Sequence, residues 1–279
     1  MNAVVASRTL VNGQRACSVD IDNRGLAYGD GLFETVLVRA GEPLWLAEHL
    51  QRLASGARRL QIPCDIDLLA FECSRLLLGV GPENVILKIV VTRGAVARGY
   101  SPLAAKSVRI VSLSPAGTSN SATYWQQGVA IGVCQTRLAR QTALAGIKHL
   151  NRLEQVLAAG EMQRRGFIEG LVLDDAGRII EATRSNVFIV TAGCLHTPAL
   201  NDCGVNGIMR QQILNVAARL GLKTKVAPLE MSALRSADEV FICNSVIGIW
   251  PVTKIECMHK GIGPVSGQLQ REFESHFYA

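Results

Sequence analysis

The stretch AGIKHLNRLEQVL, residues 145–157, places a single lysine, Lys148, immediately before a segment with the spacing of an amphipathic helix. A lysine amine attacks a carbonyl group only when it is unprotonated, whereas its ordinary pKa of about 10.4 keeps it charged at neutral pH. Partial burial and nearby positive charge lower that pKa. Lys148 is therefore a candidate for an imine-forming lysine. The alternative is a solvated lysine, because most lysines in proteins are exposed.

Two other segments carry residue types that would complement such a lysine. Glu181 ends the apolar pair Ile179-Ile180, where a carboxylate that faces inward must be paired, because burying an unpaired charge is unfavourable. A strand-end glutamate in solvent is the alternative. The residues Gly204-Val205-Asn206-Gly207 predict a tight turn before a helix, and free N–H groups at a helix N-terminus attract anions. Such turns are also common without any ligand.

Together, Gly146–Arg152, Glu181 with Asn186–Phe188, and Gly204–Arg210 resemble the fold-type IV pyridoxal-phosphate enzymes. This family includes branched-chain and D-amino-acid aminotransferases and the lyases that act on 4-amino-4-deoxychorismate. The similarity is greatest to the lyases, in residues 144–157, 204–211, 93–94 and 98–101. It extends over nearly the whole chain, from residues 22–24 to residues 251–252.

The resemblance implies pyridoxal 5'-phosphate as the cofactor, with Lys148 as the lysine that binds it covalently and also moves a proton. It assigns Glu181 to the pyridine nitrogen, and the backbone of Ile208 and Met209 to the phosphate. Many relatives have threonine where this chain has Met209, so only main-chain donation is expected at this residue.

Two more residues match phosphate-binding positions of the family. Arg52, in the segment HLQRL, corresponds to an arginine whose planar guanidinium suits phosphate. An exposed helix arginine is the alternative. Ser245, six residues before Pro251, corresponds to a phosphate-contacting threonine. Its alternative is a buried serine bonded to the backbone.

Further residues are expected to bind the substrate. Arg98 and Tyr100 lie on a glycine-containing loop and are candidates to bind the substrate's carboxylates or ring, although an exposed loop arginine is the common finding. The other expected pocket residues are Tyr28, Phe33, His149 and Arg152.

Composition favours a globular protein. The 279 residues are 48% hydrophobic, with a mean hydropathy of +0.22, which can supply a sizeable core. No run of 18 apolar residues or secretory signal is visible, so a cytoplasmic protein is expected. Eight cysteines lack CxxC pairs and metal-ligand spacing, so we expect reduced, mostly buried thiols and no metal.

The charge of the chain points to a small anionic ligand. The net charge is +6, but the basic residues are dispersed and form neither a basic run nor an RNA-recognition signature. We therefore expect no nucleic-acid partner. A modest positive bias is compatible with an anionic substrate.

The local patterns predict an α+β arrangement. Expected strands are 33–38 and 43–46, joined at Ala40-Gly41, then 85–91, 108–111, 129–134, 170–173 and 178–181; expected helices lie within 46–60, 68–77 and 151–165. The Pro- and Gly-containing stretch 112–121 favours a linker. The resemblance implies two α/β domains: a smaller one at 1–114, a linker at 115–122, and a larger cofactor-binding domain at 123–279 with a barrel-like sheet.

The resemblance further implies a homodimeric lyase that converts 4-amino-4-deoxychorismate to 4-aminobenzoate and pyruvate in folate synthesis. One alternative is transamination of branched-chain or D-amino acids on the same fold. A second is a catalytically silent binding protein that retains the scaffold.

Overall fold

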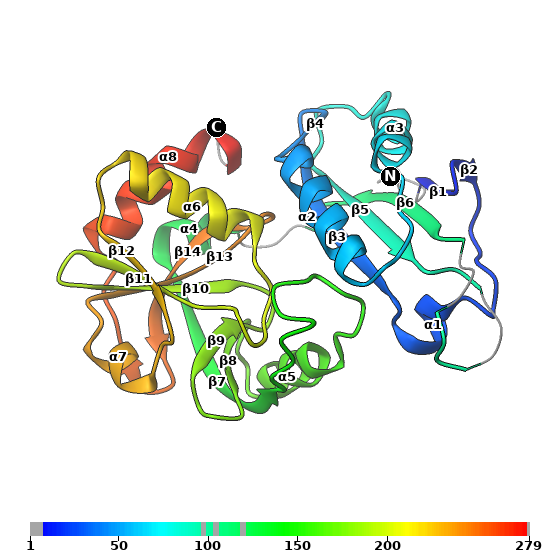
Figure 1. Cartoon of the computed structure of the whole chain (residues 1–279). Coiled ribbons are helices and arrows are strands. Elements are labelled where there is room, and N and C mark those ends of the chain that lie inside the picture. Colours follow the sequence, from blue (N-terminus) through cyan, green and yellow to red (C-terminus); the bar gives the residue numbers. More distant parts are fainter. Residues whose placement is uncertain (1–7, 96–98, 103–105, 118–120, 278–279) are drawn as a thin grey trace. The chain divides into compact units, whose positions relative to one another are not determined.

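The computed structural model describes residues 8–95, 99–102, 106–117 and 121–277. By packing, the chain separates into two compact units (Figure 1). The first is Met1–Gly117 with Ile147–Asn151, and the second is Thr118–Gly146 with Arg152–Ala279. These units differ from the expected domain boundaries at Ile147–Asn151, which lies in the expected C-terminal domain but packs in the first unit. The division into two domains stays a prediction.

The first unit has a six-stranded antiparallel sheet in the order β2-β1-β6-β5-β3-β4. Its elements are β1 (Arg8–Val11), β2 (Gln14–Arg15), α1 (Arg24–Tyr28), β3 (Gly31–Arg39), β4 (Glu42–Pro43), α2 (Leu46–Arg59), α3 (Ile66–Leu77), β5 (Val85–Thr92) and β6 (Val108–Pro115). The hairpin predicted at Ala40-Gly41 is confirmed, and both turn residues have positive φ. Its second strand is shorter than predicted, because α2 begins at Leu46.

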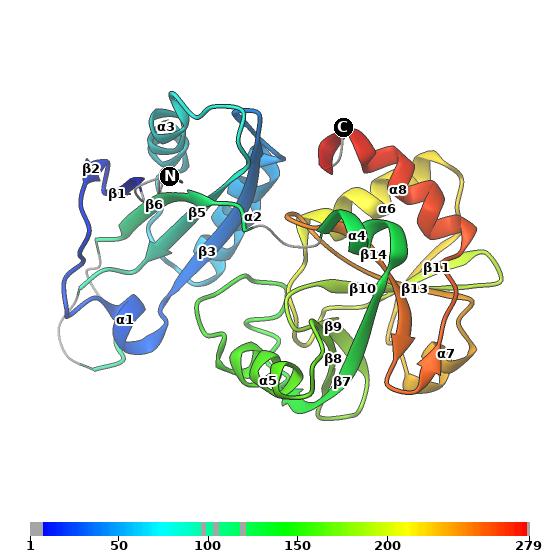
Figure 2. The same cartoon turned by 180° about the vertical axis from the view of Figure 1, so that it is seen from behind.

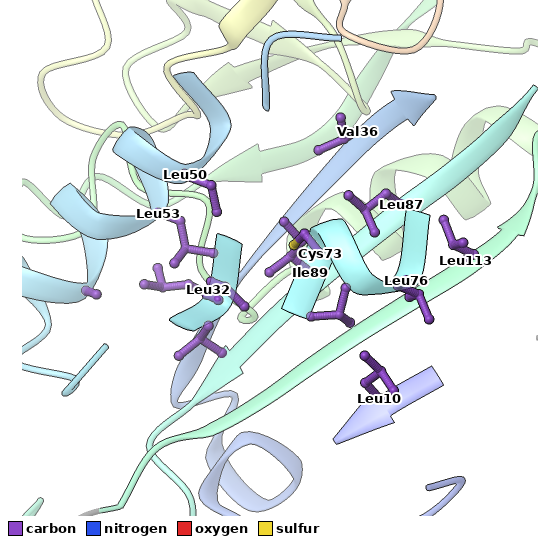
Figure 3. Close-up of a cluster of buried hydrophobic side chains, with 14 of the residues drawn as sticks. Leu10, Leu32, Val36, Leu50, Leu53, Cys73, Leu76, Leu87, Ile89 and Leu113 are labelled. Carbon is purple, nitrogen blue, oxygen red and sulfur yellow. The ribbon is translucent and has the colours of Figure 1, made fainter. Parts of the chain in front are cut away.

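The core of the first unit lies between the sheet and its two long helices. Residues two apart in a strand share a face, so Leu32 and Val36 of β3 point together into this core. Leu50 of α2 and Cys73 of α3 pack against the same cluster (Figure 3). Glu34 stands between Leu32 and Val36 on this face and is buried with them.

The second unit has a mixed nine-stranded sheet in the order β12-β11-β10-β13-β14-β7-β8-β9, with β15 on β14. Its elements are α4 (Ser121–Gln127), β7 (Val129–Leu138), α5 (Leu153–Arg164), β8 (Gly170–Asp174), β9 (Ile179–Ala182), β10 (Asn186–Thr191), β11 (Cys194–Pro198), α6 (Ile208–Arg219), β12 (Thr224–Ala227), α7 (Met231–Ser236), β13 (Glu239–Asn244), β14 (Gly248–Ile255), β15 (Met258–His259) and α8 (Pro264–Phe277). The sheet is curled, and α6 and α8 pack side by side (Figure 2). The predicted β8–β9 hairpin is confirmed.

Two strands are longer than their sequence patterns predict. β6 continues to Pro115, because Ser114 and Pro115 pair with β5. The first four residues of the stretch that favoured a linker therefore belong to the sheet. β7 likewise continues four residues beyond Cys134, where it pairs with β8. In both cases the neighbouring strand supplies backbone partners that local composition does not reveal.

All eight cysteines are free. Four of them are buried, which is fewer than the expectation of mostly buried thiols suggests. Burial raises the pKa of Cys73, Cys134 and Cys203 to about 12, so these thiols stay protonated and unreactive at neutral pH. No helix in the described part of the chain is long and apolar enough to cross a membrane.

Candidate active site

Lys148 lies on a short segment that pairs with the beginning of β3 in the first unit. The carbonyl of Lys148 accepts the N–H of Phe33 at 3.0 Å, and the N–H of Leu150 donates to Gly31 at 2.9 Å. The ammonium nitrogen of Lys148 lies 4.2 Å from the centroid of the Phe33 ring, whose face attracts a cation. The structure therefore brings together two of the predicted site residues, Lys148 and Phe33.

The residue two positions before Lys148 is fixed in the second unit. Gly146, at a φ of 77°, donates its N–H to Gly204 at 2.9 Å and accepts the N–H of Asn206 at 3.2 Å. Gly204 also has positive φ, a region that glycine enters without steric penalty. Gly146 is thus held at the turn that precedes α6.

This turn leads into the N-terminus of α6, as predicted. The N-cap residue, Gly207, provides no side-chain cap to the first turn, where Ile208 and Met209 stand. Asn186 donates its amide to the carbonyl of Val205 at 2.9 Å, and a Cβ on Gly207 would lie 2.0 Å from the Asn186 Oδ1. The turn is therefore tightly held, and the helix presents N–H groups and a positive dipole end, which favour an anion.

Glu181 is a buried carboxylate beside the same turn. Its side chain is on β9, and the residue is 5% exposed. Its Oε2 accepts the N–H of Val205 at 2.8 Å, and its Oε1 accepts the Gln155 amide at 3.3 Å. The alternative of a solvent-exposed glutamate is therefore wrong. Gln155 carries no sequence signal for this contact, because it looks like an ordinary residue of a surface helix.

Arg152 contributes positive charge near Glu181. Burial lowers the pKa of Arg152 below its ordinary value, although the negative charges of Glu181 and Glu154 act in the opposite direction. A guanidinium remains charged at neutral pH even so. The structure therefore groups Arg152, a predicted pocket residue, with Glu181 in the second unit.

Ser245 lies in the turn after β13. Asn244 of this turn is hydrogen-bonded to Ser185, and the next residue, Asn186, is hydrogen-bonded to the turn before α6. The Asn244 Oδ1 accepts the N–H groups of Val246 and Ile247 at 2.9 and 3.0 Å, and its amide donates to the Ser185 hydroxyl at 3.2 Å. Ser185 directly precedes Asn186. The predicted phosphate-binding residues of the second unit, Ile208, Met209 and Ser245, thus lie at two turns that are both hydrogen-bonded to the segment Ser185-Asn186.

Arg52 is on α2 and is not the exposed arginine of the alternative, since its side chain is 14% exposed. Its Nε donates to the Glu34 Oε1 at 2.8 Å, and its Nη2 donates to the Oε2. The His49 Nδ1 lies 2.6 Å from the same Oε2. Sequence reasoning missed Glu34 and His49. One signal was available: a charged residue between the apolar Leu32 and Val36 of a strand needs a buried partner.

Two further expected substrate residues, Tyr28 and Tyr100, are in the first unit and are exposed. The rings of Tyr28 and Tyr100 are 5.4 Å apart, and Tyr100 is 84% exposed. The guanidinium of Arg24 stacks on Tyr28 and also donates to the carbonyl of Gly99 at 2.7 Å. The structure therefore positions the residues that follow Arg98. Arg98 itself lies outside the described residues.

The family comparison and the similar proteins point to the same family. The family described as amino-transferase class IV matches residues 31–255. An aminodeoxychorismate lyase of Vibrio harveyi is 35% identical over 95% of this chain and 98% of its own length. A D-alanine aminotransferase of Listeria monocytogenes is 31% identical over 97% and 94%.

Solved structures show the same relationship. The crystal structure of 4-amino-4-deoxychorismate lyase from Pseudomonas aeruginosa matches with a TM-score of 0.91 and 44% identity, over 96% of this chain and 98% of that one. The branched-chain aminotransferase of Escherichia coli matches with a TM-score of 0.86 and 27% identity, over 97% and 94%. The predicted fold-type IV architecture is thereby confirmed, and the protein belongs to the amino-transferase class IV family.

Proposed function

We propose that the protein is a pyridoxal-phosphate-dependent lyase that converts 4-amino-4-deoxychorismate to 4-aminobenzoate and pyruvate, a step of folate synthesis. The observation that carries this proposal is the 44% identity to a lyase of that specificity over nearly all of both chains. The aminotransferase relatives named above are 27–31% identical. An anionic small molecule also agrees with the net charge of +6.

The donor set of the chain fits this cofactor. Glu181 is a buried carboxylate beside the α6 turn that accepts hydrogen bonds from Gln155 and the Val205 N–H, and a buried carboxylate is a suitable partner for a protonated ring nitrogen. The uncapped N-terminus of α6 suits a phosphate dianion. We propose that the backbone of Ile208 and Met209, the Ser245 hydroxyl and the Arg52 guanidinium hold that phosphate. When bound, pyridoxal phosphate supplies an electrophilic aldehyde and a ring that accepts electrons.

The proposed work of the protein is binding and proton transfer. The Lys148 Nζ would bind the cofactor covalently, and after displacement by the substrate amine it would take the proton from the carbon that bears the substrate nitrogen. Glu181 would keep a proton on the ring nitrogen. The ether C–O bond on the neighbouring ring carbon would then break and enolpyruvate would leave, take up the proton held by Lys148 and tautomerise to pyruvate. Formation of the aromatic ring makes this loss hard to reverse. Arg98, Tyr100 and Arg152 are the proposed carboxylate and ring contacts, and Tyr28 and Phe33 the proposed pocket walls.

Transamination is the second candidate, because a D-alanine aminotransferase is 31% identical over 97% of the chain. That reaction returns the proton to the cofactor carbon instead of expelling a leaving group. Liquid chromatography of 4-aminobenzoate formed from the chorismate derivative, compared with glutamate formed from an amino donor and 2-oxoglutarate, separates the two. A silent binding protein would give neither product.

The attachment site is tested by borohydride reduction followed by peptide mass spectrometry. We expect a phosphopyridoxyl group on Lys148 and none on Lys88, a second lysine near the Phe33 ring at 5.9 Å. Lys148→Arg should abolish the label while the far-ultraviolet circular dichroism is unchanged. A label on another lysine, or a protein that stays colourless with added cofactor, would refute the proposal.

We further propose that the protein is a homodimer in the cytoplasm. Helix α5 exposes Leu153, Val156 and Leu157, which are 70%, 62% and 57% exposed and three or four residues apart on one helix face. A second copy of the chain would cover this face. Eight cysteines without a disulfide favour a reducing compartment.

A further inference from the structure

Glu34 and His49 form a buried polar pair behind Arg52 in the first unit. Glu34 is 1% exposed and His49 is fully buried. Both oxygens of Glu34 are engaged: Oε1 accepts from the Arg52 Nε, and Oε2 accepts from the Arg52 Nη2 and contacts the His49 Nδ1. The carboxylate therefore holds the guanidinium at two points and is itself held by an imidazole.

The charges of this group are set by its surroundings. Burial alone raises the pKa of Glu34, but the positive charge of Arg52 and the hydrogen bond with His49 outweigh it, so the pKa lies below its ordinary value. Because an ionised carboxylate only accepts hydrogen bonds, the His49 Nδ1 must carry the proton between them. The other ring nitrogen, Nε2, has no hydrogen-bond partner in the described part of the chain. The polar role of His49 is thus directed at Glu34.

This geometry fixes the direction of the guanidinium. A bidentate carboxylate occupies the Nε–Nη2 edge and sets the plane of the group, so the remaining N–H groups point in a defined direction. A free arginine side chain has many conformations. When a ligand restricts it to one, the loss of conformational entropy reduces the binding affinity. An arginine that is already ordered by a buried carboxylate avoids this loss.

We infer that Glu34 and His49 are positioning residues that act on the cofactor phosphate through Arg52. This inference rests on the proposed function, in which Arg52 binds that phosphate. Glu34 itself does not bind the cofactor. It holds the arginine in the orientation that receives the phosphate, and His49 holds Glu34.

The chain provides a matched control. Glu72 and Arg109 form a second bidentate pair in the first unit, with contacts of 2.7–3.1 Å and side chains that are 2% and 14% exposed. The corresponding values for Glu34 and Arg52 are 1% and 14%. Glu34→Gln and Glu72→Gln therefore remove the same charge from the same kind of pair at the same depth.

The experiment measures the dissociation constants of the cofactor-free protein for pyridoxal phosphate and for pyridoxal, which lacks the phosphate, by absorbance titration. We expect Glu34→Gln to raise the dissociation constant for pyridoxal phosphate about 10- to 100-fold, the range for the loss of a hydrogen bond to a charged group. The dissociation constant for pyridoxal should rise less than about 2-fold. Glu72→Gln should change neither constant by more than about 2-fold. In an Arg52→Lys background, Glu34→Gln should add less than about 2-fold, because the partner it orients is gone.

The outcomes separate the two proposals. If the unmodified protein binds neither compound, the proposed function fails. If it binds both, but Glu34→Gln weakens them equally or no more than Glu72→Gln does, the positioning role is refuted. Should Glu34→Gln not fold by circular dichroism, His49→Asn and His49→Leu take its place. Asn retains an N–H near the position of Nδ1, so it should weaken pyridoxal phosphate less than Leu does; equal effects would refute the inference.

Discussion

At the scale of single residues, Glu181 is a buried carboxylate, and its proposed partner is the protonated ring nitrogen of the cofactor. The Glu181 carboxylate accepts hydrogen bonds from two neutral donors, Gln155 and the Val205 N–H, and it also interacts electrostatically with Arg152. Its neighbour Arg152 is partly buried. This arrangement supports the proposed pairing with a protonated ring nitrogen.

We expect Glu181→Gln to lower the rate of 4-aminobenzoate formation by about 100-fold, since a neutral amide does not stabilise a positive charge on the ring nitrogen. Liquid chromatography with saturating cofactor measures this rate. Absorbance should show that the variant still binds the cofactor.

Glu239→Gln is the matched control in the second unit. Glu239 is also buried, and it accepts the N–H groups of Val265 and Ser266 at the beginning of α8. Its substitution should lower the melting temperature but leave the rate within about 2-fold. Similar rate losses in the two variants would contradict a specific role for Glu181.

At the scale of elements, the position of the α6 N-terminus depends on a glycine that packs against an asparagine. A Cβ on Gly207 would lie 2.0 Å from the Asn186 Oδ1, so Gly207→Ala must displace the turn or the amide. We expect the affinity for pyridoxal phosphate to fall at least about 10-fold, because the N–H groups of the first helical turn move away from the phosphate. Absorbance titration measures this change.

Gly221 lies just beyond the other end of α6 and serves as the control. Its φ is 69°, and no atom of the described residues lies within 4 Å of the position that a Cβ would take, so Gly221→Ala strains the backbone without moving the N-terminus. It should cost about 1 kcal/mol of stability and leave the cofactor affinity unchanged. An equal loss of affinity in both variants would mean that general destabilisation of α6 explains the effect.

At the scale of the whole molecule, the proposed dimer interface is the exposed apolar face of α5, and a charge introduced there tests the proposal. We expect Val156→Asp to shift the protein from dimer to monomer, because a charge in a desolvated interface is unfavourable. Light scattering coupled to size-exclusion chromatography measures the mass. Phe71→Asp, at an exposed apolar residue of α3, should leave the mass unchanged. A dimer in both variants would place the interface elsewhere.

The sequence alone was sufficient for features with a local physical cause. The Ala40-Gly41 hairpin and the beginning of α6 after Gly207 follow from turn preferences and side-chain periodicity. For Glu181 the sequence left a buried and an exposed position open, and the structure shows the buried one. The proposed roles of Lys148, Arg52 and Ser245 came from family resemblance and stay predictions.

Only the tertiary structure decided which distant residues meet. It pairs Val129 with Val252, joins Glu34 to His49 and Arg52 across a strand and a helix, and packs Ile147–Asn151 with the first unit instead of the second. The physical reason is that backbone preferences act over a few residues. Contacts between separated segments are selected by the burial of whole faces and by the pairing of every buried polar group.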